Sequence, residues 1–277
     1  MELTTISALA DAQGIHDRGF IKALALVARE VTRRNVRTVG ISGSQGSGKS
    51  TFARMLSELL MTESDQKNTT LSLDDFYKTR AERTQLAATV HPLFLTRGVP
   101  GTHDVRLMLD VKNRLLQGAV VEVPVFDKGS DDRRKQTRRI GPVQLIILEG
   151  WCFSAVAQDE AALQLPVNEL ERLQDPQAVW RKAVNQKLAG SDYQALFEVE
   201  LSVFFQAPDM ESIIRWRLEQ ELRFNQGALS MTEQQIREFV QYYQRLTDWM
   251  LQDRSGSSDI VIALNQDHSV SGVSLDD

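Results

Sequence analysis

Short runs of apolar residues alternate along this chain with longer stretches in which apolar and polar residues are mixed. Short apolar runs are typical of buried strands, and longer mixed stretches are typical of helices with one apolar face. The segments predicted to be strands or extended are residues 37–42, 71–73, 120–126, 143–148, 201–205 and 259–264. The segments predicted to be helices are residues 6–34, 52–60, 105–117, 208–221 and 232–251. This alternation predicts a three-layer α/β fold, with a mostly parallel central sheet covered by helices on both faces.

The segments between these elements carry weaker patterns. Residues 78–104 contain several prolines and glycines, and we expect them to be largely loop. Residues 153–197 are polar and are predicted to be mostly helical, with interruptions at two prolines. Residues 259–264 are predicted to form the last strand, and residues 265–270 a closing loop after it.

The length of 277 residues allows one large domain or two small ones. We expect a single domain over residues 1–277. Within it, residues 1–35 are predicted to form an N-terminal helical extension, residues 152–197 a helical insertion, and residues 209–251 a further helical region.

Composition and charge narrow the class of protein. Hydrophobic residues make up 42% and charged residues 25% of the chain, which is typical of a soluble globular protein. The net charge of −5 gives no overall signature of nucleic-acid binding, and no apolar run approaches the ~20 residues that span a membrane. Cys152 is the only cysteine, so no internal disulfide is possible. We therefore expect a cytoplasmic protein without a nucleic-acid or membrane partner, and its oligomeric state stays open.

The strongest chemical signal is the octapeptide Gly-Ser-Gln-Gly-Ser-Gly-Lys-Ser at residues 43–50. It matches G-x-x-x-x-G-K-[ST] at every fixed position, between a predicted strand and a predicted helix. Glycines let such a loop wrap around an anion, and its N–H groups then point at phosphate oxygens. The chain is thus predicted to have the fold of a P-loop NTPase. The residues expected to bind the nucleotide are Gly43, Ser44, Gln45, Gly46, Ser47, Gly48, Lys49, Ser50 and Thr51.

Phosphoryl transfer also needs a metal site and a group that orients the attacking oxygen. Lys49 is expected near the β- and γ-phosphates, and Ser50 is expected to offer its hydroxyl to Mg²⁺. Glu149 ends a predicted buried strand, where such folds place an acid near Mg²⁺. Asp74 and Asp75 end another strand, where a carboxylate can accept the proton of a substrate hydroxyl. The alternatives are a solvated acid for Glu149 and a turn or helix cap for the two aspartates.

Two sets of residues carry a resemblance to known kinases. The glycine loop and Leu-Asp-Asp-Phe-Tyr at residues 73–77 together resemble the phosphoribulokinase, uridine kinase and pantothenate kinase group. Within that group, Thr-Arg-Gly-Val-Pro-Gly-Thr-His-Asp at residues 96–104 resembles the D-glycerate 3-kinase family. Further matches lie at residues 90–93, 126–128, 149–152, 180–185 and 243–247. The resemblance extends over residues 36–270.

This resemblance implies ATP-dependent phosphorylation of a hydroxyl on a small metabolite, with ATP and Mg²⁺ as cofactors and D-glycerate as the leading acceptor. It also implies that Asp74 is the base-like residue. The residues expected to hold the acceptor are Asp75, Tyr77, Arg97, Gly98, Thr102, His103, Asp104, Asp127, Lys128 and Arg133. Among them, Arg97, Lys128 and Arg133 are the candidate cations for a carboxylate.

The helix at residues 213–223 resembles the lid of this group, so the region 209–251 is expected to be lid-like. Arg215 is the candidate for stabilising charge during transfer, and a solvated helix with Glu–Arg pairs is the alternative. His268 is a candidate neighbour of adenine, with a structural role as the alternative. Residues 153–156 depart from the glycine-containing loop typical of the family, which leaves the acceptor open.

Three functions therefore compete. The first is a kinase for a small hydroxy acid, with D-glycerate as the leading candidate. The second keeps the mechanism but has a nucleoside, sugar or pantothenate-like acceptor. The third is a nucleotide-dependent switch or ATPase without a small-molecule acceptor, which the resemblance at residues 96–104 disfavours because a switch needs no acceptor pocket.

Overall fold

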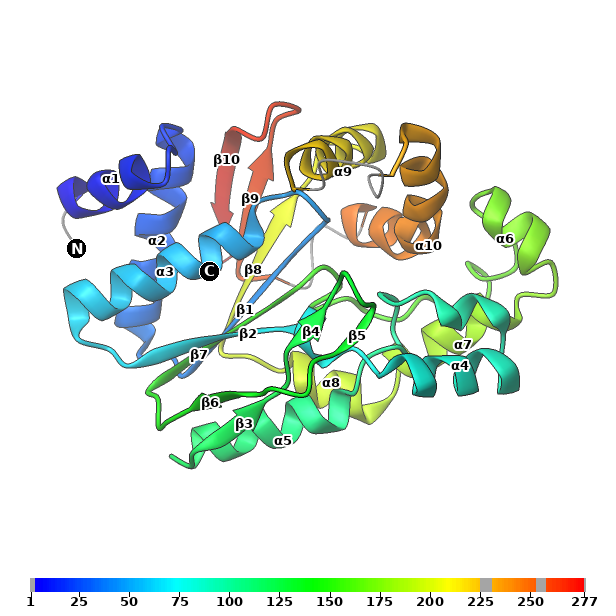
Figure 1. Ribbon diagram of the computed structural model, residues 1–277. Coiled ribbons are helices and arrows are strands. Elements are labelled where there is room, and N and C mark those ends of the chain that lie inside the picture. Colours follow the sequence, from blue (N-terminus) through cyan, green and yellow to red (C-terminus); the bar gives the residue numbers. More distant parts are fainter. Residues whose placement is uncertain (1–2, 225–230, 253–257, 277) are drawn as a thin grey trace.

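A six-stranded sheet forms the centre of the computed structural model, which describes residues 3–224, 231–252 and 258–276. Its strands are β1 (Thr38–Gly43), β2 (Asn68–Ser72), β7 (Leu145–Gly150), β8 (Leu201–Gln206), β9 (Ile260–Leu264) and β10 (Val270–Leu275). Their order across the sheet is β10-β9-β8-β1-β7-β2 (Figure 1). All neighbours pair in parallel except β9 and β10. The predicted α/β fold with a mostly parallel sheet is confirmed.

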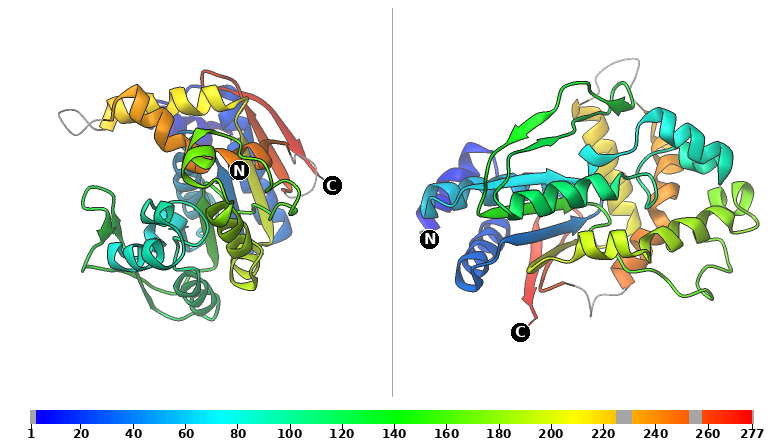
Figure 2. Two further views of the ribbon diagram at one scale, coloured as in Figure 1. Left: turned by 90° about the vertical axis from the view of Figure 1, so that its right-hand side faces the viewer. Right: turned by 90° about the horizontal axis from the view of Figure 1, so that it is seen from below.

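Both faces of the sheet carry an apolar core, because successive side chains along each strand point to opposite faces. In β7, Leu145 and Ile147 face one core, whereas Ile146 and Leu148 face the other. The first core is covered by α1 (Leu3–Ala12), α2 (Arg18–Arg34), α3 (Lys49–Ser64) and α9 (Met210–Phe224). The second is covered by α5 (Val105–Leu116), α7 (Val179–Leu188), α8 (Ser191–Phe197) and α10 (Glu233–Gln252). Helices therefore lie on both sides of the sheet (Figure 2).

The predicted N-terminal helix is two helices, α1 and α2, separated by a turn at residues 13–17. Asp17 caps α2 by accepting hydrogen bonds from the backbone N–H of Gly19 and Phe20 at 2.9 and 3.2 Å. The same carboxylate accepts from the N–H of Val270 in β10 at 2.7 Å. One side chain therefore starts a helix and fastens it to the edge strand of the sheet.

One loop prediction and the prediction of the last strand are wrong. Residues 78–104 contain α4 (Arg80–Thr89) and a 3-10 turn, η2 (Pro92–Leu95). The missed signal is a capping box, in which Thr79 and Glu82 satisfy each other's backbone N–H groups at the start of α4. Residues 265–269 form a turn as expected, but the strand before them is not the last one, because β10 follows and pairs antiparallel with β9.

The region after β7 is also less helical than predicted. Residues 155–168 form turns and irregular backbone, and helices begin only with α6 (Glu169–Gln174), before α7 and α8. Residues 120–126 join no strand of the main sheet. They enter two small antiparallel pairs, β3 (Val121–Val123) with β6 (Arg138–Ile140) and β4 (Phe126–Asp127) with β5 (Asp132–Arg133). Among the helices of the described residues, none combines the length and apolar character that a membrane crossing requires.

Arg83 of α4 holds the β4–β5 hairpin and the loop after α4 together. Its side chain is fully buried, and its guanidinium donates to the carbonyl oxygens of Leu95 at 2.6 Å and Asp131 at 2.7 Å. It also forms an ion pair with the carboxylate of Asp131 at 2.9 Å. Without the guanidinium, these part-buried backbone acceptors would lose their partner and Asp131 its ion pair, at a combined cost of about 3 kcal/mol.

We therefore expect Arg83→Met to lower the free energy of unfolding by about 3 kcal/mol, measured by denaturant titration. Arg80→Met, in the exposed first turn of the same helix, is the matched control and should change stability by less than about 0.5 kcal/mol. Equal stability of the two variants would show that the Arg83 contacts do not support the fold.

Candidate active site

The glycine loop is packed closely against strand β8 and helix α9. β1 ends at Gly43 and α3 begins at Lys49, and Gly43, Gly46 and Gly48 have φ values of 153°, 80° and 88°. A Cβ atom on Gly43 would lie 2.7 Å from Cβ of Phe205, and one on Gly46 would lie 2.8 Å from Cβ of Trp216. Glycine is thus required at both positions by close packing as well as by backbone angle.

Several polar groups of this loop have no close partner within the described residues and are suited to bind a ligand. The hydroxyls of Ser44 and Ser47 are buried and have no hydrogen-bond partner in the described residues. Nζ of Lys49 lies 3.5 Å from the carbonyl oxygen of Ser44. The hydroxyl of Ser50 donates to Oε2 of Glu149 at 3.2 Å, so the two predicted metal ligands, which are 99 residues apart in sequence, are neighbours.

The oxygen atoms of Ser50 and Glu149 are better suited to Mg²⁺ than to a metal whose ligands all come from the protein. Only 6% of Glu149 is exposed, and both groups offer oxygen, which Mg²⁺ prefers. Among the described residues, no group of three or more His, Cys, Asp or Glu side chains is placed to hold a metal. Mg²⁺ commonly takes one or two protein ligands and completes its shell with phosphate oxygens and water, which is what this pair allows.

A cavity of about 650 Å³ lies beside the glycine loop, a size suited to a small ligand. The N-terminal part of α3 borders it with Thr51 and Arg54, and α9 borders it with Trp216. His268 lines the cavity beside Trp216, with the two ring centroids 4.5 Å apart. The turn between α1 and α2, residues 13–17, also lines the cavity. That last contribution could not be predicted from local sequence, because it depends on how α2 packs against β10.

The acceptor side begins where β2 passes into the 3-10 turn η1 (Leu73–Phe76). Oδ1 of Asp74 accepts a hydrogen bond from the hydroxyl of Tyr77 at 2.6 Å, and Oδ2 accepts from Nζ of Lys128 at 2.6 Å. Burial alone would raise the pKa of Asp74, but the ammonium of Lys128, the Tyr77 hydroxyl and the charge of Lys49 hold this pKa well below its ordinary value. Asp74 is therefore ionised at neutral pH.

Asp75 lies in a different environment from Asp74. It accepts a hydrogen bond from the backbone N–H of Phe126 at 3.4 Å, so it faces β4. Burial raises the pKa of Asp75, and the hydrogen bond from Phe126 opposes this rise. The two adjacent carboxylates therefore have different partners, and their difference in role stays a prediction.

The loop from Gly98 to Asp104 is shaped by aromatic residues from distant elements. The carbonyl oxygen of Gly98 accepts from Nε1 of Trp151 at 2.7 Å, and its N–H donates to Oγ1 of Thr102 at 2.9 Å. Gly98 has a φ of 128°, and a Cβ atom there would lie 2.3 Å from the ring of Tyr243. The string that carries the family resemblance is thus a tightly packed backbone turn.

His103 is stacked on Tyr77, with ring centroids 4.9 Å apart. It is 2% exposed, and burial lowers its pKa to about 3, so the imidazole is neutral. The hydroxyl of Tyr193 accepts a hydrogen bond from the N–H of Gly101 at 2.9 Å and lies 2.8 Å from Nδ1 of His103. Its own proton is then available for Nδ1, which places the imidazole proton on Nε2, an atom without a partner in the described residues.

The three candidate cations for an acceptor carboxylate are engaged to different degrees. Arg133 donates to the carbonyl oxygen of Tyr77 at 2.7 Å and pairs with Asp104 at 3.2 Å. Arg97 forms an ion pair with Asp131 and lies over the ring of Phe126. Lys128 is 65% exposed and pairs with Asp74. Arg133 and Arg97 therefore have structural partners, whereas Lys128 is held only at the candidate base.

The remaining predicted residues lie farther from this centre. Oδ1 of Asp127 accepts from the N–H of Gly129 at 2.9 Å, inside the β4–β5 turn. Arg215 is exposed on α9. Arg217, which the sequence did not single out, is 18% exposed and pairs with Glu221 at 2.7 Å. Burial raises the pKa of Tyr243, and the charges of Arg97 and Arg217 oppose this rise. The charge of Arg217 therefore acts on Tyr243.

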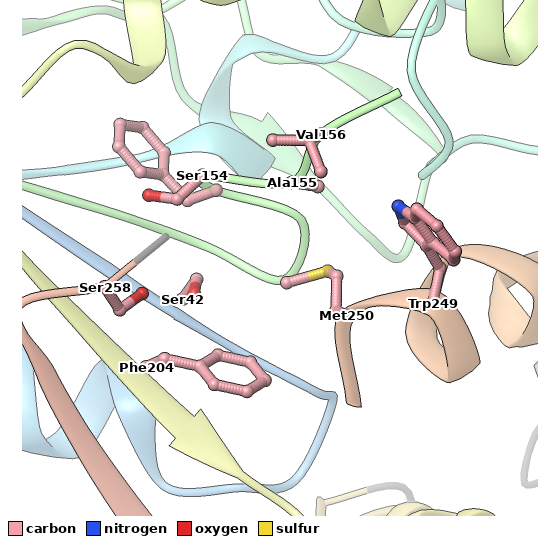
Figure 3. A pocket seen from close by; sticks show the side chains of 9 residues that line it. Ser42, Ser154, Ala155, Val156, Phe204, Trp249, Met250 and Ser258 are labelled. Atoms are coloured by element: carbon pink, nitrogen blue, oxygen red, sulfur yellow. The ribbon is translucent and has the colours of Figure 1, made fainter. Parts of the chain in front are cut away.

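Residues 153–156 lack the glycine expected in this loop, but one of them keeps a backbone conformation typical of glycine. Ser154 has a φ of 66°, the left-handed backbone conformation that glycine adopts most easily. The ring of Phe153 covers Gly40 of β1, where a Cβ atom would lie 2.7 Å from it. Figure 3 shows the small hollow next to this segment, facing Phe204 and Met250. Its volume of about 10 Å³ is at most that of one water molecule, which excludes an acceptor there.

Comparison with known proteins places these features in a family. The model of the "Phosphoribulokinase / Uridine kinase family" matches residues 38–173. "Uncharacterized kinase mug58" of Schizosaccharomyces pombe is 36% identical over 224 residues, covering 74% of this chain and 77% of the relative. "Probable ATP-dependent kinase TDA10" of Saccharomyces cerevisiae is 30% identical over 225 residues, covering 73% of each.

Two solved structures have the same fold. "Structure of YGR205w protein" superposes with a TM-score of 0.75 at 24% identity, covering 92% of this chain and 97% of that one. A D-glycerate 3-kinase from Cryptococcus neoformans superposes with a TM-score of 0.75 at 23% identity, covering 92% and 98%. At this level of identity both similarities concern the fold.

We expect His268→Ala to raise KM for ATP about 3- to 10-fold with little change in kcat, because a ring contact contributes about 0.5–1.5 kcal/mol. Initial rates over a range of ATP concentrations would measure this. Lys135→Ala, on the exposed β5–β6 segment away from the cavity, is the control. An unchanged KM in the His268 variant would place the nucleobase away from this wall of the cavity.

Proposed function

We propose that this chain, which belongs to the phosphoribulokinase/uridine kinase family and is an ATP-dependent small-molecule kinase, transfers the γ-phosphate of ATP to a hydroxyl of a small hydroxy acid, D-glycerate. The observation that carries the choice of an acid is the position of Lys128. Its ammonium lies 2.6 Å from Asp74, so an acceptor hydroxyl at Asp74 would bring a neighbouring carboxylate within reach of a cation. The resemblance of residues 96–104 to the D-glycerate 3-kinase family supports the same acceptor.

The residues on the nucleotide side would bind ATP through the backbone N–H groups of residues 43–51 and the ammonium of Lys49. Ser50 and Glu149 would hold Mg²⁺, which neutralises charge on the β- and γ-phosphates when it is bound. Arg215 and Arg217 of α9 are the candidates for stabilising the charge of the γ-phosphate during transfer.

On the acceptor side, Asp74 would orient the hydroxyl and take its proton. The hydroxyl oxygen forms a bond to the γ-phosphorus, and the bond from that phosphorus to the β–γ bridging oxygen breaks, so that ADP leaves with the electron pair. Tyr77 steadies Asp74, and the neutral His103 offers a donor at Nε2. Thr102 and Asp104 keep the loop that starts at Gly98 in place. Asp75, Arg97, Asp127 and Arg133 shape the surrounding wall.

We also infer a cytoplasmic location, because the reaction consumes ATP and Cys152 is a buried free thiol whose pKa is raised by burial. A thiol of this kind is suited to a reducing compartment.

The test of the acceptor is ADP release from the purified protein with Mg-ATP and one added compound at a time. The panel is D-glycerate, L-glycerate, uridine, pantothenate, ribulose 5-phosphate and simple sugars. We expect strong stimulation by D-glycerate alone. Stimulation by uridine, pantothenate or a sugar instead would overturn the choice of an acid while keeping the kinase. Hydrolysis that no compound stimulates would favour an ATPase or an acceptor of another class.

A second prediction separates the two aspartates. Asp74→Asn should keep ATP affinity but lower kcat by about 100-fold or more, the scale of a positioned base. Asp75→Asn removes a charge from the adjacent residue and should lower kcat by less than about 10-fold. Single-turnover transfer and equilibrium ATP binding measure the two effects. Equal losses in both variants would contradict the assignment of the base to Asp74.

A further inference from the structure

Both oxygens of the candidate base are occupied in the structure. Oδ1 of Asp74 holds the hydroxyl of Tyr77, and Oδ2 holds the ammonium of Lys128, each at 2.6 Å. A carboxylate oxygen in contact with an ammonium is a poor acceptor for the proton of an alcohol, because the charge that would attract the proton is already neutralised. Each oxygen keeps a second lone pair, so Asp74 can accept a proton in this state, but it becomes a much stronger base when the ammonium leaves.

Tyr77 is the partner that stays. It is 5% exposed and packed between His103 and Phe126, with ring centroids 4.9 and 5.1 Å away. Burial raises the pKa of Tyr77 well above its ordinary value, and the charge of Asp74 adds to this rise, so its hydroxyl remains a donor. Oδ1 is therefore a fixed anchor, and Oδ2 is the atom that can change partner.

Lys128 is the partner that is free to move. Its side chain is 65% exposed and lies in the turn between β4 and β5. The ends of that turn are fixed, by the bond from Gly129 to Asp127 on one side and by the contacts of Arg83 with Asp131 on the other. A lysine stem rotates easily on such a fixed backbone. Among the described residues, Asp74 is the one ion-pair partner of Lys128.

We propose that Lys128 selects the acceptor by exchanging partners: the carboxylate of an incoming hydroxy acid takes its ammonium away from Asp74, and Oδ2 then accepts the proton of the acceptor hydroxyl. This inference rests on the proposed function and names the element that makes an acid the preferred acceptor. In the transfer, the hydroxyl oxygen bonds to the γ-phosphorus, ADP leaves with the electron pair of the broken bond, and the hydroxyl proton moves to Oδ2. Lys128 keeps its own protons throughout.

A neutral polyol has no carboxylate to attract Lys128, so the ammonium stays on Oδ2 and Asp74 stays a weaker base. The same exchange explains why the ammonium of Lys128 contacts Asp74 directly. The other charged or titratable groups that act on or lie next to Asp74 are Lys49 on α3, Asp75 and Tyr77 in and after η1, His103, Cys152 and Tyr243. These groups remain in place when Lys128 is substituted.

The test compares Lys128→Met with the wild-type protein on D-glycerate and on glycerol, which has the same hydroxyls without the carboxylate. The expected result is that kcat/KM for D-glycerate falls about 100-fold, while kcat/KM for glycerol rises about 10-fold because the base is freed. A lysine that only bound the carboxylate would not raise the glycerol rate. Lys128→Arg should keep most of the preference for D-glycerate.

Lys135→Met is the matched control. It removes the same charge from an exposed position of the neighbouring segment and should leave both rates unchanged. ATP affinity and thermal unfolding of the Lys128 variants establish that they are folded.

The pH profile of the glycerol reaction gives an independent result. Lys128 lowers the pKa of Asp74, and the reaction needs Asp74 without its proton. In Lys128→Met the pKa of Asp74 rises, so the acid limb of kcat/KM should move to higher pH. An acid limb at the same pH would contradict the exchange.

The outcomes separate the two proposals. If the wild-type protein phosphorylates D-glycerate but Lys128→Met keeps the same ratio of D-glycerate to glycerol, the exchange is wrong and the proposed function stands. If the wild-type protein does not phosphorylate D-glycerate at all, the proposed function fails and this inference fails with it.

Discussion

The parallel pairing of β7 with β1 and β2 is the constraint on which the rest of the site depends. In this register Glu149 lies beside Ile41 of β1 on one side and Ser72 of β2 on the other. The three strands end together, so the glycine loop, the metal-side acid and Asp74 meet at one edge of the sheet. A shift of one residue in either pairing would turn these side chains to the opposite face. The chemistry is therefore fixed by backbone hydrogen bonds deep in the sheet.

The two halves of the site are built differently. The nucleotide half is made from the sheet and the glycine loop, where close backbone packing against Phe205 and Trp216 leaves few alternatives. The acceptor half is made from loops that depend on buried polar groups, such as Arg83 beneath the β4–β5 hairpin. A rigid phosphate site joined to an adaptable acceptor wall is suited to a family in which the acceptor varies while the transferred group does not.

The parts of the structure that local sequence could predict are those with a strong local cause. The glycine spacing and the apolar runs of β1, β7 and β8 identified the sheet and its ligand edge. Helix α4 was missed although its capping box is visible at Thr79 and Glu82, because the prolines and glycines nearby favour a loop. Strand β10 was missed because an edge strand with an exposed face has no continuous apolar pattern to reveal it.

The sequence by itself determined the fold class, the phosphate-binding loop and the side chains from which we propose that the acceptor site is made, because each follows from a local pattern of residue types. Only the tertiary structure decided which of those side chains are available. Arg97 and Arg133 look equivalent to Lys128 in the sequence, yet Asp131, Asp104 and a carbonyl oxygen already hold them. The availability of a charge depends on partners that are distant along the chain, and folding alone brings those partners together.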